Sequence, residues 1–261
     1  MNKTIICLSF DDGRKDFYDY AFPILKKYNL VASLNVTSGY VDGTFNPDWP
    51  TSYGAVTIDE LNEMKDYGIE IAYHGDQHIT QENDFTTSIN KFKKWKLREN
   101  KMGFAVPGSY LANVDVPKFK KFLSDNSVIY MRVDNDARCN KFMNKVFRKL
   151  YNMTNIYWFY KLYNSNNSKK TISDWYNLSS IIVFKKDSSL CLNKYVDSQV
   201  KKNTLNIFML HGILPKDNSC YGNDEYAWDL DNFENFCKHL SELCLDNKIE
   251  VKTLISVVKE M

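Results

Sequence analysis

Two adjacent acidic residues and a pair of histidines stand where metal binding and proton transfer are both feasible. Asp11 and Asp12 directly follow a short, largely apolar run near the start of the chain, and His74 and His78 lie four residues apart. That spacing lets both imidazoles reach one ion from a loop or a short helical turn. Two imidazoles and one carboxylate suit zinc or another divalent transition metal and leave positions open for water and substrate.

The adjacent acidic residues have room for separate roles. Neighbouring strand residues point to opposite sides, so one carboxylate is free to bind a cation while the other accepts a proton. The alternative is a solvated Asp-Asp-Gly turn that caps a helix. A third histidine, His211, also follows an apolar run, whereas His239 falls in a helical pattern and is interpreted as a surface or packing residue.

Strand-like and helix-like segments alternate along the chain and predict a parallel α/β fold. The predicted strands are 5–8, 30–36, 69–73, 102–109 with a break at Pro107-Gly108, 128–133, 181–184 and 205–210, with a short one near the end. The predicted helices are 17–28, 57–67, 84–100, 117–125 and 231–245, with one more at the end, and 39–54 is predicted to be a loop. Since the carboxyl ends of parallel strands carry the active sites of such folds, the acidic and histidine residues are expected to meet there.

Length and composition favour a single globular domain over residues 1–261. The chain is 44% hydrophobic and 25% charged, with a formal net charge of +2. No apolar stretch approaches the ~20 residues that span a bilayer. The chain starts without a signal-peptide pattern, and its six cysteines are scattered without metal-site or paired spacing. We therefore expect a cytoplasmic protein with reduced cysteines.

The segment from about 136 to 170 differs in kind and is interpreted as an insert. It holds eight basic residues and one acidic residue, interleaved with aromatic side chains. One interpretation is a helical cap whose aromatic residues join the core. The other is a surface that rests on an anionic membrane, so the protein would be membrane-associated. Nothing besides charge favours nucleic acid, and none is expected as a partner.

The combination of these motifs resembles the polysaccharide deacetylase family, the NodB-homology carbohydrate esterases. The run 9–13 resembles its first motif, 74–78 its second, 104–109 its third and 210–211 its fifth. The resemblance implies a distorted (β/α)7 barrel. It also implies a metal-dependent amide hydrolase acting on carbon–nitrogen bonds other than peptide bonds.

The family motifs assign roles to individual residues. The resemblance makes Asp12, His74 and His78 the metal ligands, Asp11 the general base and His211 the general acid. The backbone N–H of Gly108 would help to stabilise the oxyanion. Further residues expected near the substrate or oxyanion are Pro107, Leu210 and Arg132.

The sequence departs from the family pattern at two motifs. Ala105 stands where many members carry an arginine that holds the base aspartate, so Asp11 lacks its expected partner unless Arg132 replaces it. The fourth motif, an Asp that orients the acid histidine, is not readable, and its candidates are Asp134, Asp136 and Asp187.

Together these observations favour removal of the N-acetyl group from an acetamido sugar that is free, polymeric or carrier-linked, in the synthesis or modification of a surface glycan. The expected cofactor is Zn²⁺, with Co²⁺ or Mn²⁺ as alternatives. One alternative function is a glycan-binding protein of the same fold with weak or no turnover, motivated by Ala105. The other is a hydrolase of a small non-sugar amide.

Overall fold

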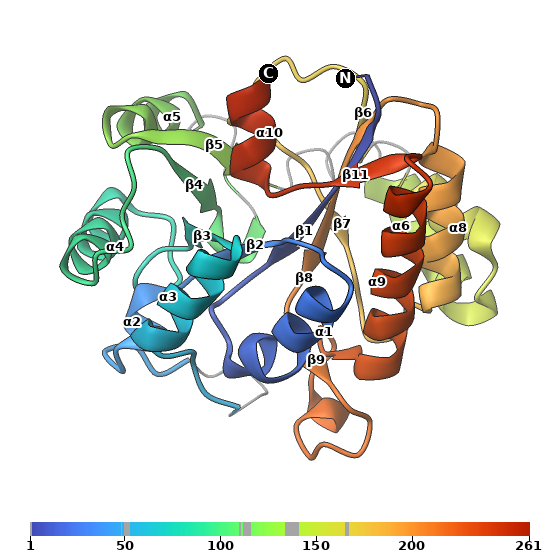
Figure 1. Ribbon diagram of the computed structural model, residues 1–261, viewed down its shortest axis with the longest axis horizontal. Coiled ribbons are helices and arrows are strands. Elements are labelled where there is room, and N and C mark those ends of the chain that lie inside the picture. The colour runs from blue at the N-terminus through green and yellow to red at the C-terminus, as the bar shows by residue number, and fades with distance from the viewer. Residues whose placement is uncertain are drawn as a thin grey trace.

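Seven strands form a closed circuit in the computed structural model, which describes residues 2–47, 49, 53–109, 111, 116–133, 141–164 and 167–261 (Figure 1). Parallel neighbours follow the order β5 (Val128–Arg132), β4 (Met102–Ala105), β3 (Glu70–Tyr73), β2 (Ser33–Val36), β1 (Thr4–Phe10) and β8 (Leu205–Leu210). β7 (Ile181–Ile182) pairs with β8. Leu178, just before β7, closes the circuit through backbone hydrogen bonds with Met131 (3.1 Å) and Val133 (2.8 Å). The predicted distorted barrel is confirmed.

The barrel spreads apart at the amino-terminal ends of its strands. β1 pairs with β11 (Ile249–Val251) along its first half and with β2 only near its end. β8 similarly pairs first with the antiparallel β6 (Ser168–Lys169) and then with β7. The seven strands therefore converge toward their carboxyl ends, and the loops that follow them gather there. A separate parallel pair is formed by β9 (Ile213–Leu214) and β10 (Trp228–Asp229).

The side chains of β1 alternate between the interior of the barrel and the surrounding helices. Ile6, Leu8 and Phe10 belong to the large apolar cluster between barrel and helices. Ile5 and Cys7 belong to a second apolar cluster, which includes residues of β5, β8 and the last helix. Because the side-chain period of a strand is two, the next positions on the interior side are Ser9 and Asp11.

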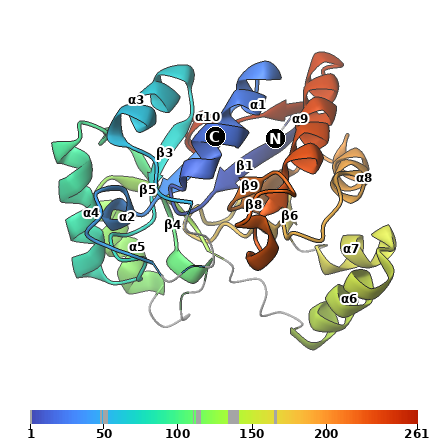
Figure 2. The same cartoon turned by 90° about the horizontal axis from the view of Figure 1, so that it is seen from below.

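Helices surround the barrel (Figure 2). They are α1 (Phe22–Lys27), α2 (Ser38–Val41), α3 (Ile58–Tyr67), α4 (Glu82–Lys94), α5 (Val116–Asp125), α6 (Lys141–Thr154), α7 (Tyr157–Tyr163), α8 (Ser189–Gln199), α9 (Leu230–Leu245) and α10 (Leu254–Glu260). A π-helical turn precedes α1 at Phe17–Ala21, and short 3₁₀ turns occupy Pro107–Ser109 and Tyr221–Asn223. The sequence pattern did not predict α8, whose apolar face is weakly marked.

Local signals explain several helix boundaries. Thr57 and Glu60 form the predicted capping box at the start of α3, and Gly68 ends that helix with a φ of 115°. Glycine favours this left-handed backbone because it has no Cβ. One expectation is corrected: the predicted loop 39–54 contains part of α2, which begins where the backbone N–H of Ser38 donates to the carbonyl of Gly75 at 3.0 Å.

The predicted insert forms two helices that pack on each other, and α7 also packs on α8. Figure 2 shows α6 and α7 at one side of the barrel. Tyr151 and Tyr160 are buried, with ring centroids 5.2 Å apart, which agrees with the interpretation of a packed cap. Trp158 is 57% exposed. Whether 1–261 functions as one domain with an insert stays a prediction.

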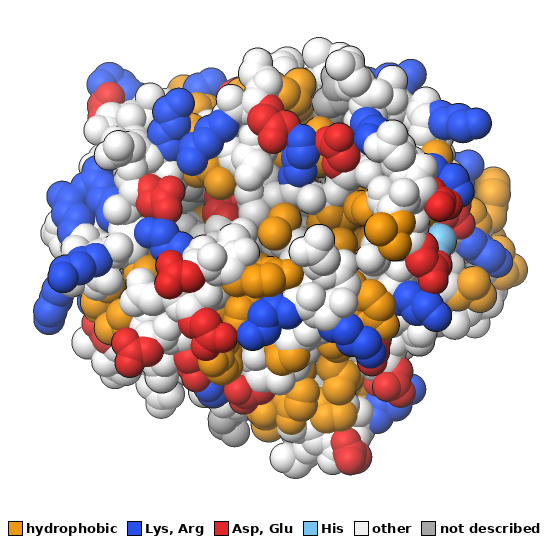
Figure 3. Space-filling model, viewed as in Figure 1, with side chains coloured by type: hydrophobic (Ala, Val, Ile, Leu, Met, Phe, Trp, Pro, Cys, Tyr) orange, Lys and Arg blue, Asp and Glu red, His pale blue; other side chains and the backbone are white. Residues whose placement is uncertain are grey.

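Acidic and basic side chains are interspersed on the face seen in Figure 3. Elsewhere in the fold, exposed ion pairs join α1 to α3 through Lys26 and Glu63, and α1 to α9 through Lys27 and Glu234. Such exposed pairs each contribute about 0–1 kcal/mol. Across the residues that the structure describes, none of the helices combines the length and apolar character that crossing a bilayer requires.

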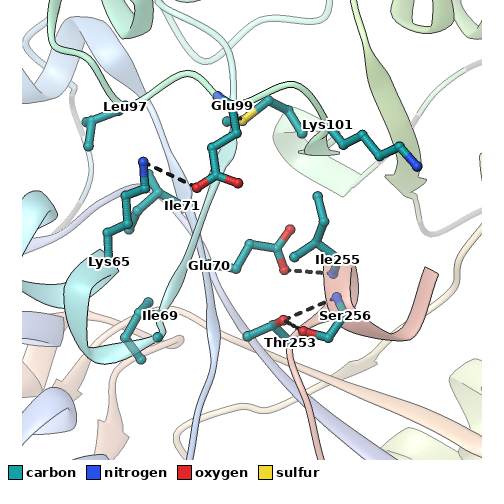
Figure 4. A pocket seen from close by; sticks show the side chains of 12 residues that line it. Lys65, Ile69, Glu70, Ile71, Leu97, Glu99, Lys101, Thr253, Ile255 and Ser256 are labelled. Atoms are coloured by element: carbon teal, nitrogen blue, oxygen red, sulfur yellow. Dashed lines mark hydrogen bonds and ion pairs between the residues drawn. The ribbon is translucent and has the colours of Figure 1, made fainter. Parts of the chain in front are cut away.

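Helix α10 lies at the amino-terminal end of the barrel, where its backbone contacts Glu70 (Figure 4). The carboxylate of Glu70 is buried and accepts hydrogen bonds from the Tyr130 hydroxyl (2.7 Å), the Ser33 hydroxyl (2.6 Å) and the Ile255 N–H (3.0 Å). Burial raises the pKa of Glu70, although these hydrogen bonds oppose the shift. Glu70 therefore couples β2, β3, β5 and α10 at the end of the barrel opposite the loops.

We expect the unfolding free energy of Glu70→Gln to rise relative to that of the wild type as pH rises above 4.5, the pKa of this carboxyl in the unfolded chain. In that range the unfolded chain ionises while folded Glu70 still holds its proton, so wild-type stability falls with pH. Glutamine does not titrate. Urea unfolding at pH 4 and pH 7 measures the difference, and an equal difference at both would contradict the raised pKa. Glu70→Leu should destabilise by about 1–3 kcal/mol because buried donors lose their acceptor.

Candidate metal and hydrolytic site

Asp12, His74 and His78 converge at the carboxyl ends of β1 and β3. The Asp12 Oδ1 lies 3.5 Å from His74 Nε2 and 3.6 Å from His78 Nε2. Ligands at about 2.0–2.2 Å from a tetrahedral zinc ion lie roughly 3.3–3.6 Å apart, so the spacing fits such an ion. Among the described residues this is a group whose ligand atoms all lie within 4.8 Å of one another. The predicted ligands are thus brought together.

Left-handed backbone positions these ligands. Asp12 has a φ of 79° and His78 a φ of 55°, values that few non-glycine residues adopt. The expectation that Asp11 and Asp12 point to opposite sides, as strand neighbours do, is therefore corrected. β1 ends at Phe10, and the turn at Asp12 brings both carboxylates to the same cavity, where they have different partners.

Hydrogen bonds outside the ligand set fix the two histidines. The Nδ1 of His74 lies 2.9 Å from the carbonyl of Ala105, which places the proton on Nδ1 and leaves Nε2 free to bind a metal. The Asp84 carboxylate accepts the N–H groups of Asp76 and Gln77, both at 2.7 Å, and so holds the loop between the histidines. Ala105 thus contributes to the site through its carbonyl.

The electrostatics favour ionised Asp12 and neutral His78. Burial would raise the pKa of Asp12, but the hydrogen bond with His74 and the neighbouring imidazoles lower the pKa below its usual value. Burial, together with His74, lowers the pKa of His78 to about 4. A histidine must be neutral to bind a metal, so both groups are in the form that a ligand needs at neutral pH.

Arg132 holds the Asp11 carboxylate. Its Nη2 lies 2.5 Å from both carboxylate oxygens, and both side chains are buried. Asn35 Nδ2 also donates to Asp11, at 2.8 Å. Burial would raise the pKa of Asp11, but the Arg132 charge, followed by those of His74 and His211, holds it below the usual value. The structure thus gives Asp11 the cationic partner that Ala105 cannot supply.

His211 follows β8 and lies beside Asp11. Its Nε2 is 3.9 Å from Asp11 Oδ2, and its ring centroid is 4.7 Å from that of Tyr226. Burial lowers the pKa of His211, and Asp12 and Asp11 oppose this shift. Its buried Nδ1 makes no hydrogen bond within the described part of the chain.

These residues line one cavity of about 540 Å³. Its lining consists of Asp11, Asp12, Arg14, Trp49, His74, His78, Gly108, His211, Asn223, Asp224, Glu225 and Tyr226. Gly108 has a φ of 64° and open space at its Cβ position. Pro107 and Leu210 lie outside this lining; the Leu210 carbonyl accepts the N–H of Asp11 at 3.0 Å. Leu210 therefore helps to position Asp11 through its backbone.

Sequence reasoning missed a buried charge network at the edge of the cavity. Arg14 Nη1 donates to Asp224 (2.8 Å), and its Nη2 donates to Asp16 (2.5 Å). All three side chains are buried. The partners are separated by 210 positions, so only the arginine directly after Asp-Asp-Gly offered a signal.

The fourth family motif has no assigned residue. Asp134 and Asp136 lie outside the described residues. Asp187 is buried and accepts the N–H of Phe184 at 2.8 Å, while its carbonyl accepts the Trp228 indole N–H at 2.6 Å. It makes no hydrogen bond to His211, so it does not orient that ring by such a bond.

The fold and site define a parallel α/β barrel with a two-histidine, one-aspartate centre at its carboxyl end. Residues 1–102 match the family model described as polysaccharide deacetylase. The predicted resemblance to the polysaccharide deacetylase family is therefore confirmed. A search of curated proteins found no match.

Three solved structures illustrate the relationship. A Streptococcus pyogenes deacetylase, PplD in complex with acetate, is 26% identical, covers 44% of this chain and 51% of its own, and has a TM-score of 0.38. PdaA of Bacillus subtilis, a family 4 carbohydrate esterase, is 14% identical over 99% of this chain and 82% of its own (TM-score 0.53). A CE4 family pseudoenzyme of Bacillus anthracis is 11% identical over 98% of this chain and 66% of its own (TM-score 0.51). The latter two show a shared fold.

Replacing Arg132 with methionine should raise the pKa of Asp11, because the carboxylate then stays buried without its cation. Unfolding free energy should fall by about 3–5 kcal/mol, the usual cost of breaking a buried pair. Carbon NMR titration of side-chain carboxyls measures the pKa, with Asp11→Asn identifying the resonance. Arg132→Lys, which keeps a charge, is the control. An Asp11 resonance that titrates unchanged in Arg132→Met would exclude this arginine as the partner.

Proposed function

We propose that this protein is a metal-dependent hydrolase that removes the N-acetyl group from an acetamido sugar. The observation that carries the proposal is the convergence of the Asp12, His74 and His78 ligand set with Asp11 and His211 in one cavity. The family match supports the class of reaction, deacetylation of an acetylated glycan. We infer Zn²⁺ as the native metal from the nitrogen and oxygen ligands, with Co²⁺ or Mn²⁺ as alternatives.

The chain's own residues divide the proton transfers between them. A divalent ion held by Asp12, His74 and His78 would supply Lewis acidity, which lowers the pKa of water and polarises an amide oxygen. Asp11, kept ionised by Arg132, accepts the proton of the attacking water. The backbone N–H of Gly108 would stabilise the oxyanion. His211, when protonated, donates to the leaving amine.

The cavity favours a sugar ring as the substrate. Its side walls include Trp49, whose ring centroid is 5.2 Å from that of His78, and Tyr226, which packs on His211. Pockets of this size are typical of small-ligand sites, and the many polar side chains in this lining suit the hydroxyl and amide groups of such a sugar. A free, polymeric or carrier-linked acetamido sugar fits this description, in the synthesis or modification of a surface glycan. We propose that residues 1–261 act as one catalytic domain.

A glycan-binding protein without turnover is the second candidate. Ala105 and the fold shared with a pseudoenzyme favour it. The Arg132 contact with Asp11 argues against it, because the base retains a cationic partner. Hydrolysis of a small non-sugar amide is a third candidate. Acetate release from N-acetylated oligosaccharides distinguishes the first from the other two.

Two variants should separate metal binding from catalysis. His74→Ala is expected to lose the metal, as it removes one of three ligands. Asp11→Asn should keep the metal and lose about 10²–10⁴-fold in kcat, the usual contribution of a general base. Elemental analysis and acetate release measure these effects, with His239→Ala as the control. A wild type that binds no metal after zinc reconstitution would refute the proposal, and metal loss in Asp11→Asn would reverse the two aspartate roles.

We also propose that α6 and α7 contact an anionic membrane while the active site acts on a lipid-linked sugar. Met153, Ile156 and Trp158 are exposed around the turn between these helices. Lys145, Lys149 and Met153 follow at four-residue intervals and share one face of α6. Basic residues near such a surface contribute roughly 1 kcal/mol each, and tryptophan favours the interface. Cytoplasmic location is part of this proposal.

Sedimentation with liposomes tests the membrane contact. We expect binding to phosphatidylserine vesicles at low salt, weaker binding at high salt, and none when Lys145 and Lys149 become Glu. Lys118→Glu, an exposed lysine on α5, is the control. Arg148 should be left unchanged, because its guanidinium packs on Phe184, 3.8 Å from the ring centroid. Absence of wild-type binding at low salt would leave α6 and α7 as a structural cap.

A further inference from the structure

The orientation of His211 depends on packing. In the proposed reaction this ring must aim a proton at the leaving amine, and misplacement by about 1 Å can cost 10²-fold in rate. Within the described chain its Nδ1 has no hydrogen bond, and Tyr226 provides its one close contact with another ring. The two rings are inclined by 46° at 4.7 Å. The position of Tyr226 therefore matters for His211.

One support of Tyr226 comes from the loop after β7 and from α6. The Phe184 and Tyr226 ring centroids are 5.5 Å apart, at 36°. Arg148 of α6 covers the Phe184 ring at 3.8 Å from its centroid. The N–H of Lys185 donates to the carbonyl of Glu225 at 2.9 Å. A continuous stack thus runs from α6 to His211.

The second support is the buried charge network. The Tyr226 N–H donates to Asp224 Oδ1 at 2.8 Å, and Arg14 Nη1 donates to Asp224 Oδ2 at 2.8 Å. Arg14 is in turn paired with Asp16. Its guanidinium packs against Gly212, where an added Cβ would lie 2.3 Å from Nη2. The network thus fixes both the backbone of Tyr226 and the residue directly after His211.

We propose that Tyr226 is a positioning residue that holds the His211 imidazole in the orientation needed for proton donation, and that the Phe184–Arg148 stack and the Arg14–Asp224 pair fix Tyr226 in turn. This inference rests on the proposed function for the role of His211. Tyr226 acts through His211, so its ring matters for this role and its hydroxyl does not. Removal of the ring should affect the transition state more than substrate binding.

Kinetics on tetra-N-acetylchitotetraose test the proposal. Tyr226→Leu should lower kcat about tenfold with little change in KM, whereas Tyr226→Phe, which keeps the ring, should retain most of the wild-type kcat. Tyr221→Leu is the matched control, since Tyr221 belongs to the same loop but its ring packs on Lys185. A raised KM with unchanged kcat in Tyr226→Leu would overturn the proposal, because it would make the ring only a sugar platform.

A second readout needs no turnover. The chain has four histidines, so the His211 ring signals in a histidine-labelled sample can be assigned with His211→Gln. Phe184→Leu keeps the Tyr226 side chain but removes the ring that packs on it, one of its two supports. It should shift or broaden the His211 signals, whereas Tyr221→Leu should not. Unchanged His211 signals in Phe184→Leu would refute the stack. If wild-type protein releases no acetate from any N-acetylated sugar, the proposed function fails, while this measurement still decides the positioning role.

Discussion

Two adjacent carboxylates buried at the end of β1 are the constraint on which the rest of the site depends. An ionised carboxylate without a partner is too costly to bury, and breaking one buried pair costs about 3–5 kcal/mol. Asp11 is compensated by Arg132 and Asn35, and Asp12 by the two imidazoles that a cation would join. Strands β2, β3 and β5 must therefore deliver these partners to the same point. The convergence of the barrel at its carboxyl end meets that requirement.

Strand periodicity and the family motifs were enough to predict the strands and the residues that follow them. Asp12, His74 and His78 follow apolar runs, and parallel strands bring such positions together, so their convergence was predictable. Asp11 was expected to lack a partner unless Arg132 supplied one, and the structure supplies it from β5. That pairing required the order of the strands, which no local pattern encodes.

Contacts between distant loops escaped prediction for a physical reason. Arg14 and Asp224 have no pattern that links them, because their pairing follows from the return of the chain after β9. Tyr226 looked like one of many tyrosines in the sequence. Helix α8 was missed since its polar residues mask its periodicity, and its capping by Ser188 was not recognised. Features fixed by non-local packing thus had no signal in the sequence, whereas features at strand ends did.

Asp11 is held by a buried ion pair and His211 by aromatic packing, and these two kinds of contact differ in strength. Aromatic contacts contribute about 0.5–1.5 kcal/mol each beyond buried area. A change at α6 that reaches His211 through Phe184 and Tyr226 therefore alters the population of the productive orientation by about tenfold at most, because 1.4 kcal/mol corresponds to a factor of ten. Loss of Arg132 removes a larger interaction from Asp11. A perturbation at α6 thus shifts the orientation of the His211 ring gradually, whereas loss of Arg132 leaves the buried Asp11 carboxylate without its cation.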